Sequence, residues 1–196
     1  MSKLLYQGHG SYRLTADDGR VIYIDPYAGE GYDAPADLIL VTHQHDDHKQ
    51  TQMCAQKTGC RIITNEDALA GDKHNSFDVD GILIEAVEAN NKNHSSKECV
   101  GFIVTLGGVK IYASGDTSKT EQMKTFAGRQ LDYAIFPGDG FYNMGPDEAA
   151  ECAGLVGAKH NIIIHLKPGE LFDREKADKW NAPNKLVVEP GQEISL

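Results

Sequence analysis

The sequence predicts an α/β fold in a single domain, and two observations lead to this prediction. Short apolar runs of strand length alternate with polar segments that suit helices. The stretch 19–25 also resembles the stretch 108–116, and each is followed by an apolar strand that starts at an aspartate, Asp37 or Asp132. We therefore expect two similar halves that face each other, in a chain of 196 residues that is long enough to bury one core.

The strands are predicted from apolar runs that end at turn residues. Polar residues at 16–19 and the pair Gly107-Gly108 each join two runs as a hairpin. The runs 37–41 and 161–164 show no polar alternation, which is the pattern of strands buried on both faces. The predicted strands are 4–6, 12–15, 20–24, 37–41, 61–64, 81–87, 100–106, 109–113, 133–136, 161–164 and 186–188.

The helices are predicted from start and stop signals. Pro146 suits a first helical turn and Gly157 suits a helix end, while Gly59 would end an earlier helix. The predicted helices are 46–57, a short one within 65–77, 118–128, 146–156 and 173–180.

Composition narrows the class of protein. The hydrophobic fraction of 40% is typical of a globular domain, and the formal net charge of −10 argues against DNA or RNA as a partner. The N-terminal segment 1–7 becomes polar too early for a signal peptide, and no apolar run reaches membrane-spanning length, so we expect a cytoplasmic protein without a membrane segment. The cysteines show no spacing that indicates disulfides, and we expect reduced thiols at Cys54, Cys60, Cys99 and Cys152.

A cluster of metal-ligand residues follows the buried strand 37–41. His43, His45, Asp47 and His48 are of the types that bind zinc, manganese or iron. In an extended chain His43 and His45 lie on the same side and can share one ion. Asp47 and His48 follow a turn and can reach a second ion. A solvated polar loop is the alternative, but three histidines so close together after a buried strand favour a metal site.

The stretch 42–48, Thr-His-Gln-His-Asp-Asp-His, resembles the His-x-His-x-Asp-His signature of the metallo-β-lactamase superfamily. The stretch 115–117, Gly-Asp-Thr, looks like the later metal-bridging aspartate of that superfamily. The segments 8–11 and 143–150, with the strand that ends at His165, resemble its UlaG-like branch of metal-dependent hydrolases. The resemblance implies a four-layer αββα sandwich, the metallo-β-lactamase fold, as one domain over residues 1–196.

The resemblance also implies a set of metal ligands. It includes His94 and His165, although a lone loop histidine is usually solvent-exposed and His160 is a rival to His165. His165 is favoured because it follows its strand, as the other ligands do, whereas His160 precedes the strand. The implied ligands are His43, His45 and His94 for the first ion, Asp47, His48 and His165 for the second, and Asp116 as the bridge.

Two divalent ions would hold a bridging hydroxide that attacks a small ester, lactone or phosphodiester. Zinc is the preferred candidate for these ions, and manganese and iron are the alternatives. Asp116 and Asp47 are the predicted catalytic residues, and Asp47 could also relay a proton to the leaving group. Because imidazole ligands must be neutral, metal affinity is expected to fall below about pH 6.5. A diiron redox protein of the same fold and a metal-binding protein with little turnover are the alternatives. The chain has no segment for the extra domains of relatives that act on glutathione thioesters or RNA, which disfavours those substrates.

Several residues have predicted roles around these ligands. Asp25 is a candidate acceptor for the second nitrogen of a ligand histidine, although an aspartate before proline also suits a turn. The predicted substrate-binding residues are His9, Tyr142, Asn143 and Lys167. The alternative for His9 is a turn histidine satisfied by the backbone, that for Tyr142 and Asn143 is packing, and that for Lys167 is an ordinary exposed lysine. The expected partner is a small-molecule substrate, and the sequence leaves a homo-oligomer open.

Overall fold

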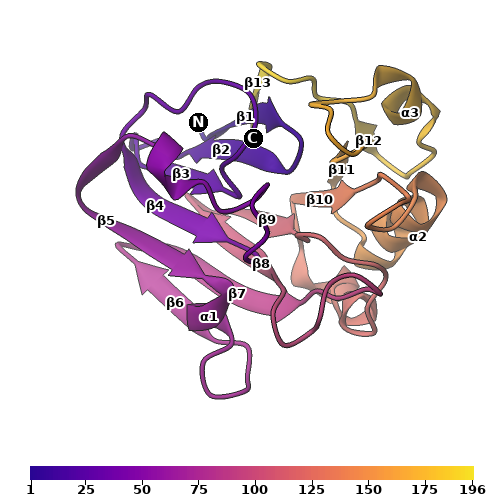
Figure 1. Cartoon of the computed structure of the whole chain (residues 1–196), viewed down its shortest axis with the longest axis horizontal. Helices are drawn as coiled ribbons and strands as arrows, with labels where there is room; N and C mark the ends of the chain where they lie inside the picture. Colours follow the sequence, from indigo (N-terminus) through magenta and orange to yellow (C-terminus); the bar gives the residue numbers. More distant parts are fainter.

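The computed structural model describes residues 1–196, and its main feature is a pair of β-sheets packed face to face (Figure 1). The first sheet has the order β13 (Glu193–Ser195), β1 (Lys3–Gly8), β2 (Ser11–Thr15), β3 (Val21–Ile24), β4 (Ala36–Val41) and β5 (Gln56–Thr64). The second sheet has the order β12 (Lys185–Leu186), β11 (His160–Ile164), β10 (Tyr133–Pro137), β9 (Val109–Ala113), β8 (Val100–Leu106), β7 (Ile82–Glu88) and β6 (Ser76–Val79).

The two sheets repeat one pattern of strand pairing. β1–β2 and β2–β3 are antiparallel, whereas β3–β4 and β4–β5 are parallel. In the second sheet β7–β8 and β8–β9 are antiparallel, whereas β9–β10 and β10–β11 are parallel. This shared topology agrees with the predicted pair of similar halves; a superposition of the halves stays the quantitative test.

The layers outside the sheets are unequal. The outer face of the second sheet packs on α2 (Pro146–Val156) and α3 (Arg174–Lys179), and the buried Trp180 follows α3 directly. Both helices lie beside β10, β11 and β12 (Figure 1). The outer face of the first sheet packs on the loop that contains Tyr32 and on Cys54, which follows the 3₁₀ helix η1 (Thr51–Met53). The αββα sandwich is therefore present, with helices concentrated on one side.

Most strands lie where the apolar runs predict them, and the predicted strands 100–106 and 109–113 match β8 and β9. The predicted helix over 46–57 is wrong, because this segment forms turns, η1 and the first residues of β5. Here the backbone N–H of Gln50 donates to Pro26 O (2.8 Å) and that of Ala55 donates to Tyr32 O (2.9 Å). These bonds to the preceding loop replace the bonds between successive turns that a helix needs.

Two further differences are local. The predicted helix 118–128 is instead two 3₁₀ helices, η2 (Gln122–Thr125) and η3 (Ala127–Arg129), and the side chain of Gln122 accepts a bond from the backbone N–H of Glu88 (2.7 Å). The strands β6 and β13 were not predicted, because they are short edge strands with few buried residues. The short helix α1 (Asn65–Ala68) falls within the segment where one was predicted.

The parallel strands explain how the fold builds a site. Parallel strands deliver the residues that follow them to one edge of a sheet. Asp25 follows β3 and His43 comes soon after β4 in the first sheet. Asp116, Asp139 and His165 come soon after β9, β10 and β11 in the second. Because the sheets face each other, both sets meet at one rim. None of the helices combines the length and apolarity that a membrane crossing requires.

Candidate metal centre

The seven predicted ligands lie together at this rim. The ligand atoms of His43, His45 and His94 lie within 4.8 Å of one another. Those of Asp47, His48 and His165 form a second group within the same limit, which also includes His9. We call these groups the first and the second subsite.

Asp116 lies between the two subsites. Its Oδ2 atom is 3.4 Å from Nε2 of His94, 3.6 Å from Nε2 of His48 and 3.5 Å from Nε2 of His165. These distances suit donors that share an ion, because ligand bonds near 2.0–2.2 Å place neighbouring donor atoms roughly 3 to 3.5 Å apart. One carboxylate oxygen therefore faces histidines of both subsites.

The histidine nitrogens that face the centre have no hydrogen-bond partner in the protein. The Nε2 atoms of His43, His48, His94 and His165 are buried and accept or donate no hydrogen bond. A buried polar atom without a partner is costly, and four of them aimed at one place need a common explanation. Divalent metal ions supply that explanation, because imidazole nitrogens and carboxylate oxygens are their usual ligands. The residues present therefore fit a metal centre.

Asp25 orients histidines of both subsites. Its Oδ2 lies 3.0 Å from Nδ1 of His48 and accepts a hydrogen bond from the Thr42 hydroxyl (2.6 Å). The Thr42 hydroxyl in turn lies 3.0 Å from Nδ1 of His43. Each Nε2 is thereby turned toward the centre, the arrangement in which a ligand histidine uses its other nitrogen to fix its ring. The sequence identified Asp25 as a candidate for this role.

Asn91 and Asp139 hold the other two buried histidines, and neither residue was singled out in the sequence. The Oδ1 atom of Asn91 lies 2.9 Å from Nδ1 of His94, and Oδ2 of Asp139 lies 3.2 Å from Nδ1 of His165. The Oδ1 atom of Asp139 also accepts backbone N–H bonds at 2.5–3.1 Å from 141, 142 and 143. The only signal for Asp139 was its position just after an apolar strand.

The charges of the centre shift several pKa values. Burial lowers the pKa of His48, but the carboxylates of Asp116 and Asp25 outweigh burial and raise it to about 9. Burial, with the nearby His48, lowers the pKa of His43 to about 2. Burial raises the pKa of Asp116, yet the surrounding histidines outweigh it and hold this pKa well below its usual range. Without metal, the centre therefore holds an ionised carboxylate and a protonated His48 at neutral pH.

The backbone is strained at three positions of the centre. His9, Asp25 and His165 have φ angles of 53°, 47° and 48°. Residues other than glycine adopt this left-handed conformation at a cost of about 1 kcal/mol or more, and such strain gathers at functional sites. Each of these residues ends or follows a strand, so the strained turn aims its side chain at the rim.

Hollows open beside both subsites. One of about 520 Å³ borders the first subsite and is lined by polar residues that include Gln44, Asn65 and Lys97. A second, of about 250 Å³, lies over both subsites and is lined by His45, Asp47, Asn93, His94, Asp116, Tyr142 and His165. A third, of about 280 Å³, lies behind His9, next to Tyr27. The metal centre is therefore accessible to a small molecule.

The predicted substrate-binding residues fall in different places. Tyr142 is exposed at the rim of the hollow over both subsites. Asn143 is buried, and its amide donates to Asp139 and accepts from Asn91. Lys167 is exposed, lies 3.5 Å from Glu170, and lines none of the three hollows. The rival His160 is exposed at the start of β11, the end opposite to His165.

The fold and the centre can now be compared with known proteins. The sequence profile described as the beta-lactamase superfamily domain matches residues 3–165. The chain belongs to the beta-lactamase superfamily. A metal-dependent hydrolase of Pyrococcus furiosus is 30% identical to it over the full length of both chains. Within this superfamily, the chain is a member of the metal-dependent hydrolases.

Solved structures share the fold of this superfamily member. One from Parabacteroides distasonis, named a metal-dependent hydrolase, is 28% identical to this chain and has a TM-score of 0.76. The match covers 94% of this chain and 91% of the Parabacteroides chain. A metallo hydrolase from Ignicoccus hospitalis is 21% identical and has a TM-score of 0.77, and the match covers 99% of this chain and 98% of the Ignicoccus chain. At that identity the second likeness shows the fold alone. The metallo-β-lactamase fold that the sequence predicts is confirmed.

Proposed function

We propose that the protein is a hydrolase of the UlaG-like type, which uses two divalent ions to cleave a small polar ester, lactone or phosphodiester. Zinc is the first candidate metal, and manganese or iron also suit the donors. One observation carries the proposal: four buried Nε2 atoms lack a hydrogen-bond partner, and three of them, those of His48, His94 and His165, lie 3.4–3.6 Å from Asp116 Oδ2. When bound, the ions would supply Lewis acidity and an activated water.

The protein's own residues would divide the remaining work. Asp116 would hold the two ions together, because its Oδ2 faces histidines of both subsites. The side chain of Asp47 is 40% exposed and lines the hollow over both subsites. It is therefore placed to take a proton after attack and to deliver it to the leaving group.

The hollow beside the first subsite supports a polar substrate. Gln44 and Asn65 are joined by a hydrogen bond of 2.8 Å at its wall, and Lys97, Glu66 and Glu98 also line it. These side chains provide both donors and acceptors for a polar group such as a hydroxyl or an amide. A substrate whose scissile bond lies over both subsites would place such a group in this hollow.

A panel of phosphodiesters, lactones and esters tests the proposal. The wild-type protein loaded with zinc or manganese should hydrolyse at least one class. Asp116→Ala should lower kcat/KM about 10³-fold or more, because the loss of metal chemistry is worth several kcal/mol. Asp46→Ala is the matched control: this aspartate lies in the same motif, but its side chain is 91% exposed.

Two outcomes would contradict the proposal. Equal activity in Asp116→Ala and the wild type would remove the bridging role. Redox-active iron without hydrolysis of any substrate would favour a diiron redox protein, and bound metals with neither activity would favour a binding protein.

A further inference from the structure

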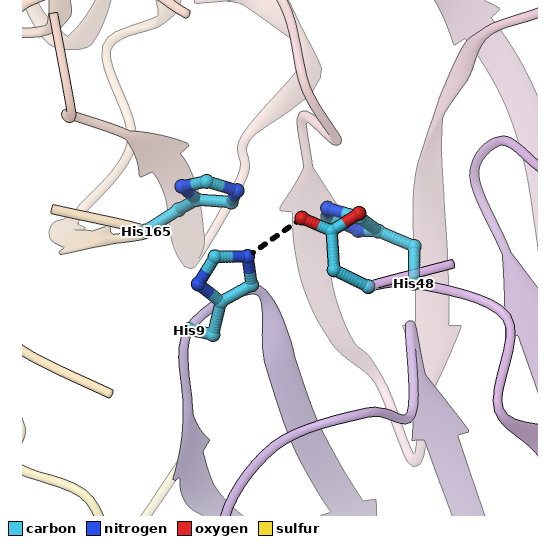
Figure 2. A group of neighbouring side chains, drawn as sticks. His9, His48 and His165 are labelled. Carbon is cyan, nitrogen blue, oxygen red and sulfur yellow. Dashed lines mark hydrogen bonds and ion pairs between the residues drawn. The ribbon is translucent and has the colours of Figure 1, made fainter. Parts of the chain in front are cut away.

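His9 belongs to the second subsite and also lines the hollow next to Tyr27. Figure 2 shows its ring beside those of His48 and His165, on the turn between β1 and β2. Its ring centroid is 3.8 Å from that of His165 and 5.9 Å from that of His48. Its ligand atom lies within 4.8 Å of those of Asp47, His48 and His165. His9 is buried, with 4% of its surface exposed.

The two glycines beside His9 allow this approach. Gly8 has a φ of 122°, which side chains rarely permit. A Cβ atom at Gly10 would lie 2.7 Å from Cε1 of His48, so only glycine lets the backbone pass this ring. Two backbone bonds then fix the turn: the N–H of His9 donates to Leu171 O (2.7 Å), and its carbonyl accepts from the N–H of His165 (2.9 Å).

Both ring nitrogens of His9 face acceptors. Its Nδ1 lies 3.4 Å from the carbonyl oxygen of Glu170, and its Nε2 lies 3.0 Å from Oδ2 of Asp47. A neutral imidazole has one N–H and satisfies one acceptor. If the proton is on Nδ1, a lone pair on Nε2 points at a carboxylate oxygen. A cation shared by these two atoms would turn that repulsion into two ligand bonds.

His9 also has the same orientation as the four buried ligand histidines. In each of those, Nδ1 faces an outer acceptor and Nε2 faces the cluster, as described above for His48. His9 repeats this pattern, with the Glu170 carbonyl as the outer acceptor. A backbone carbonyl is a common partner of a metal-bound histidine.

We propose that His9 is a ligand of the second ion. This inference rests on the two-ion centre proposed above. The second ion would then have five protein donors, His9, Asp47, His48, His165 and the bridging Asp116, whereas the first would have four. Five donors favour a five- or six-coordinate ion such as manganese or iron, and four suit tetrahedral zinc. The first ion, next to the larger hollow, would be the one that exchanges a ligand for substrate.

The direct test uses the full chain, labelled with ¹⁵N-histidine and loaded with ¹¹³Cd. Scalar coupling between ¹¹³Cd and ¹⁵N reports each metal–imidazole bond. The second-subsite cadmium should couple to three histidine nitrogens in the wild type and to two in His9→Gly. Glycine is chosen because it accepts the left-handed backbone at this position without strain. Two coupled nitrogens in the wild type would overturn the inference.

Affinity provides a second readout. In His9→Gly, competition with a chelator should show at least about 100-fold weaker binding of the second ion, with the first ion little changed. Added imidazole should restore the second ion by filling the vacated space. Unchanged affinity for both ions would reject His9 as a ligand and leave the hydrolase proposal intact. A wild-type chain that binds no second ion would instead reject the two-ion centre itself.

Discussion

The two subsites of the centre differ in how deeply the fold holds them. In the second subsite His48 and His165 are 1% and 2% exposed, and acidic side chains hold both rings from behind. In the first subsite His43 and His94 are nearly as buried, at 2% and 3% exposed, but His45 is exposed and borders the larger hollow. All histidines of the second subsite are therefore held in the core, and one histidine of the first is open to a hollow. We expect the second subsite to act as an anchor for its ion and the first to meet substrate.

The largest expected difference between the subsites is in the effect of removing one histidine from each on metal binding and on the free energy of unfolding. His48→Ala should abolish binding of the second ion and lower the free energy of unfolding of the metal-free protein by about 3 kcal/mol, because Asp25 loses a buried partner. His45→Ala should abolish the first ion but change that free energy by no more than about 0.5 kcal/mol. Urea unfolding with metal analysis measures both. Equal destabilisation by the two variants would contradict the contrast.

Asp25→Asn should weaken both ions, since Asp25 holds His48 directly and His43 through Thr42. We expect about 10- to 100-fold lower affinity at each subsite, the usual effect of losing an outer partner. Asp37→Asn is the control: this aspartate, in β4 of the same half, bonds to Lys57 and the backbone of Val21. Metal titration of both variants measures the affinity for each ion. A loss confined to one ion would mean that Asp25 serves a single subsite.

Asp139→Asn should affect the second subsite alone. It weakens the contact with His165, so affinity for the second ion should fall about 10-fold or more while the first ion stays. The same carboxylate fixes the backbone of 141–143, where the exposed Tyr142 borders the hollow, so KM should also rise. Unchanged KM together with unchanged metal binding would show that Asp139 only stabilises its loop.

The smallest expected effect is on pH dependence. Sequence alone predicts that metal affinity levels off above about pH 6.5. The pKa of about 9 at His48 moves that limit upward, because the ion must displace a proton at any lower pH. Affinity for the second ion should therefore rise about tenfold from pH 7 to pH 8. His43, with a pKa of about 2, releases no proton.

Calorimetry of zinc binding in buffers of different ionisation enthalpy measures the proton released at pH 7.5. At least about one proton per chain is expected. The stability of the metal-free fold depends on pH in the opposite direction to metal affinity. Because the pKa of His48 is higher in the folded chain than in the unfolded chain, protonated His48 stabilises the fold fully below about pH 6.5, and this stabilisation is lost as pH rises through about 9. Binding without proton release would contradict the electrostatics of the anchor.

Most strands could be predicted from the sequence because they depend on local apolar patterns, and the ligand set was proposed from a local motif together with the family resemblance. Uninterrupted apolar runs identified β4 and β11, and ligand-type residues followed them directly. The helix expected over 46–57 failed because the bonds that decide this segment come from the loop around Tyr32, which no local pattern reveals.

The outer partners and His9 could not be assigned in the same way. Asn91 and Asp139 are ordinary polar residues until folding places them behind His94 and His165. His9 is separated from His165 by most of the chain, and only the pairing of the two halves brings them within one subsite. The Gly8 and Gly10 signal indicated a tight turn, but not that the turn would pass the ring of His48.

Metal stoichiometry tests the central claim most directly. The wild-type chain, expressed with ample zinc or manganese and desalted at pH 8, should contain about two ions per chain by mass spectrometry, as the two groups of donors joined by Asp116 require. Fewer than one ion per chain would contradict the metal centre.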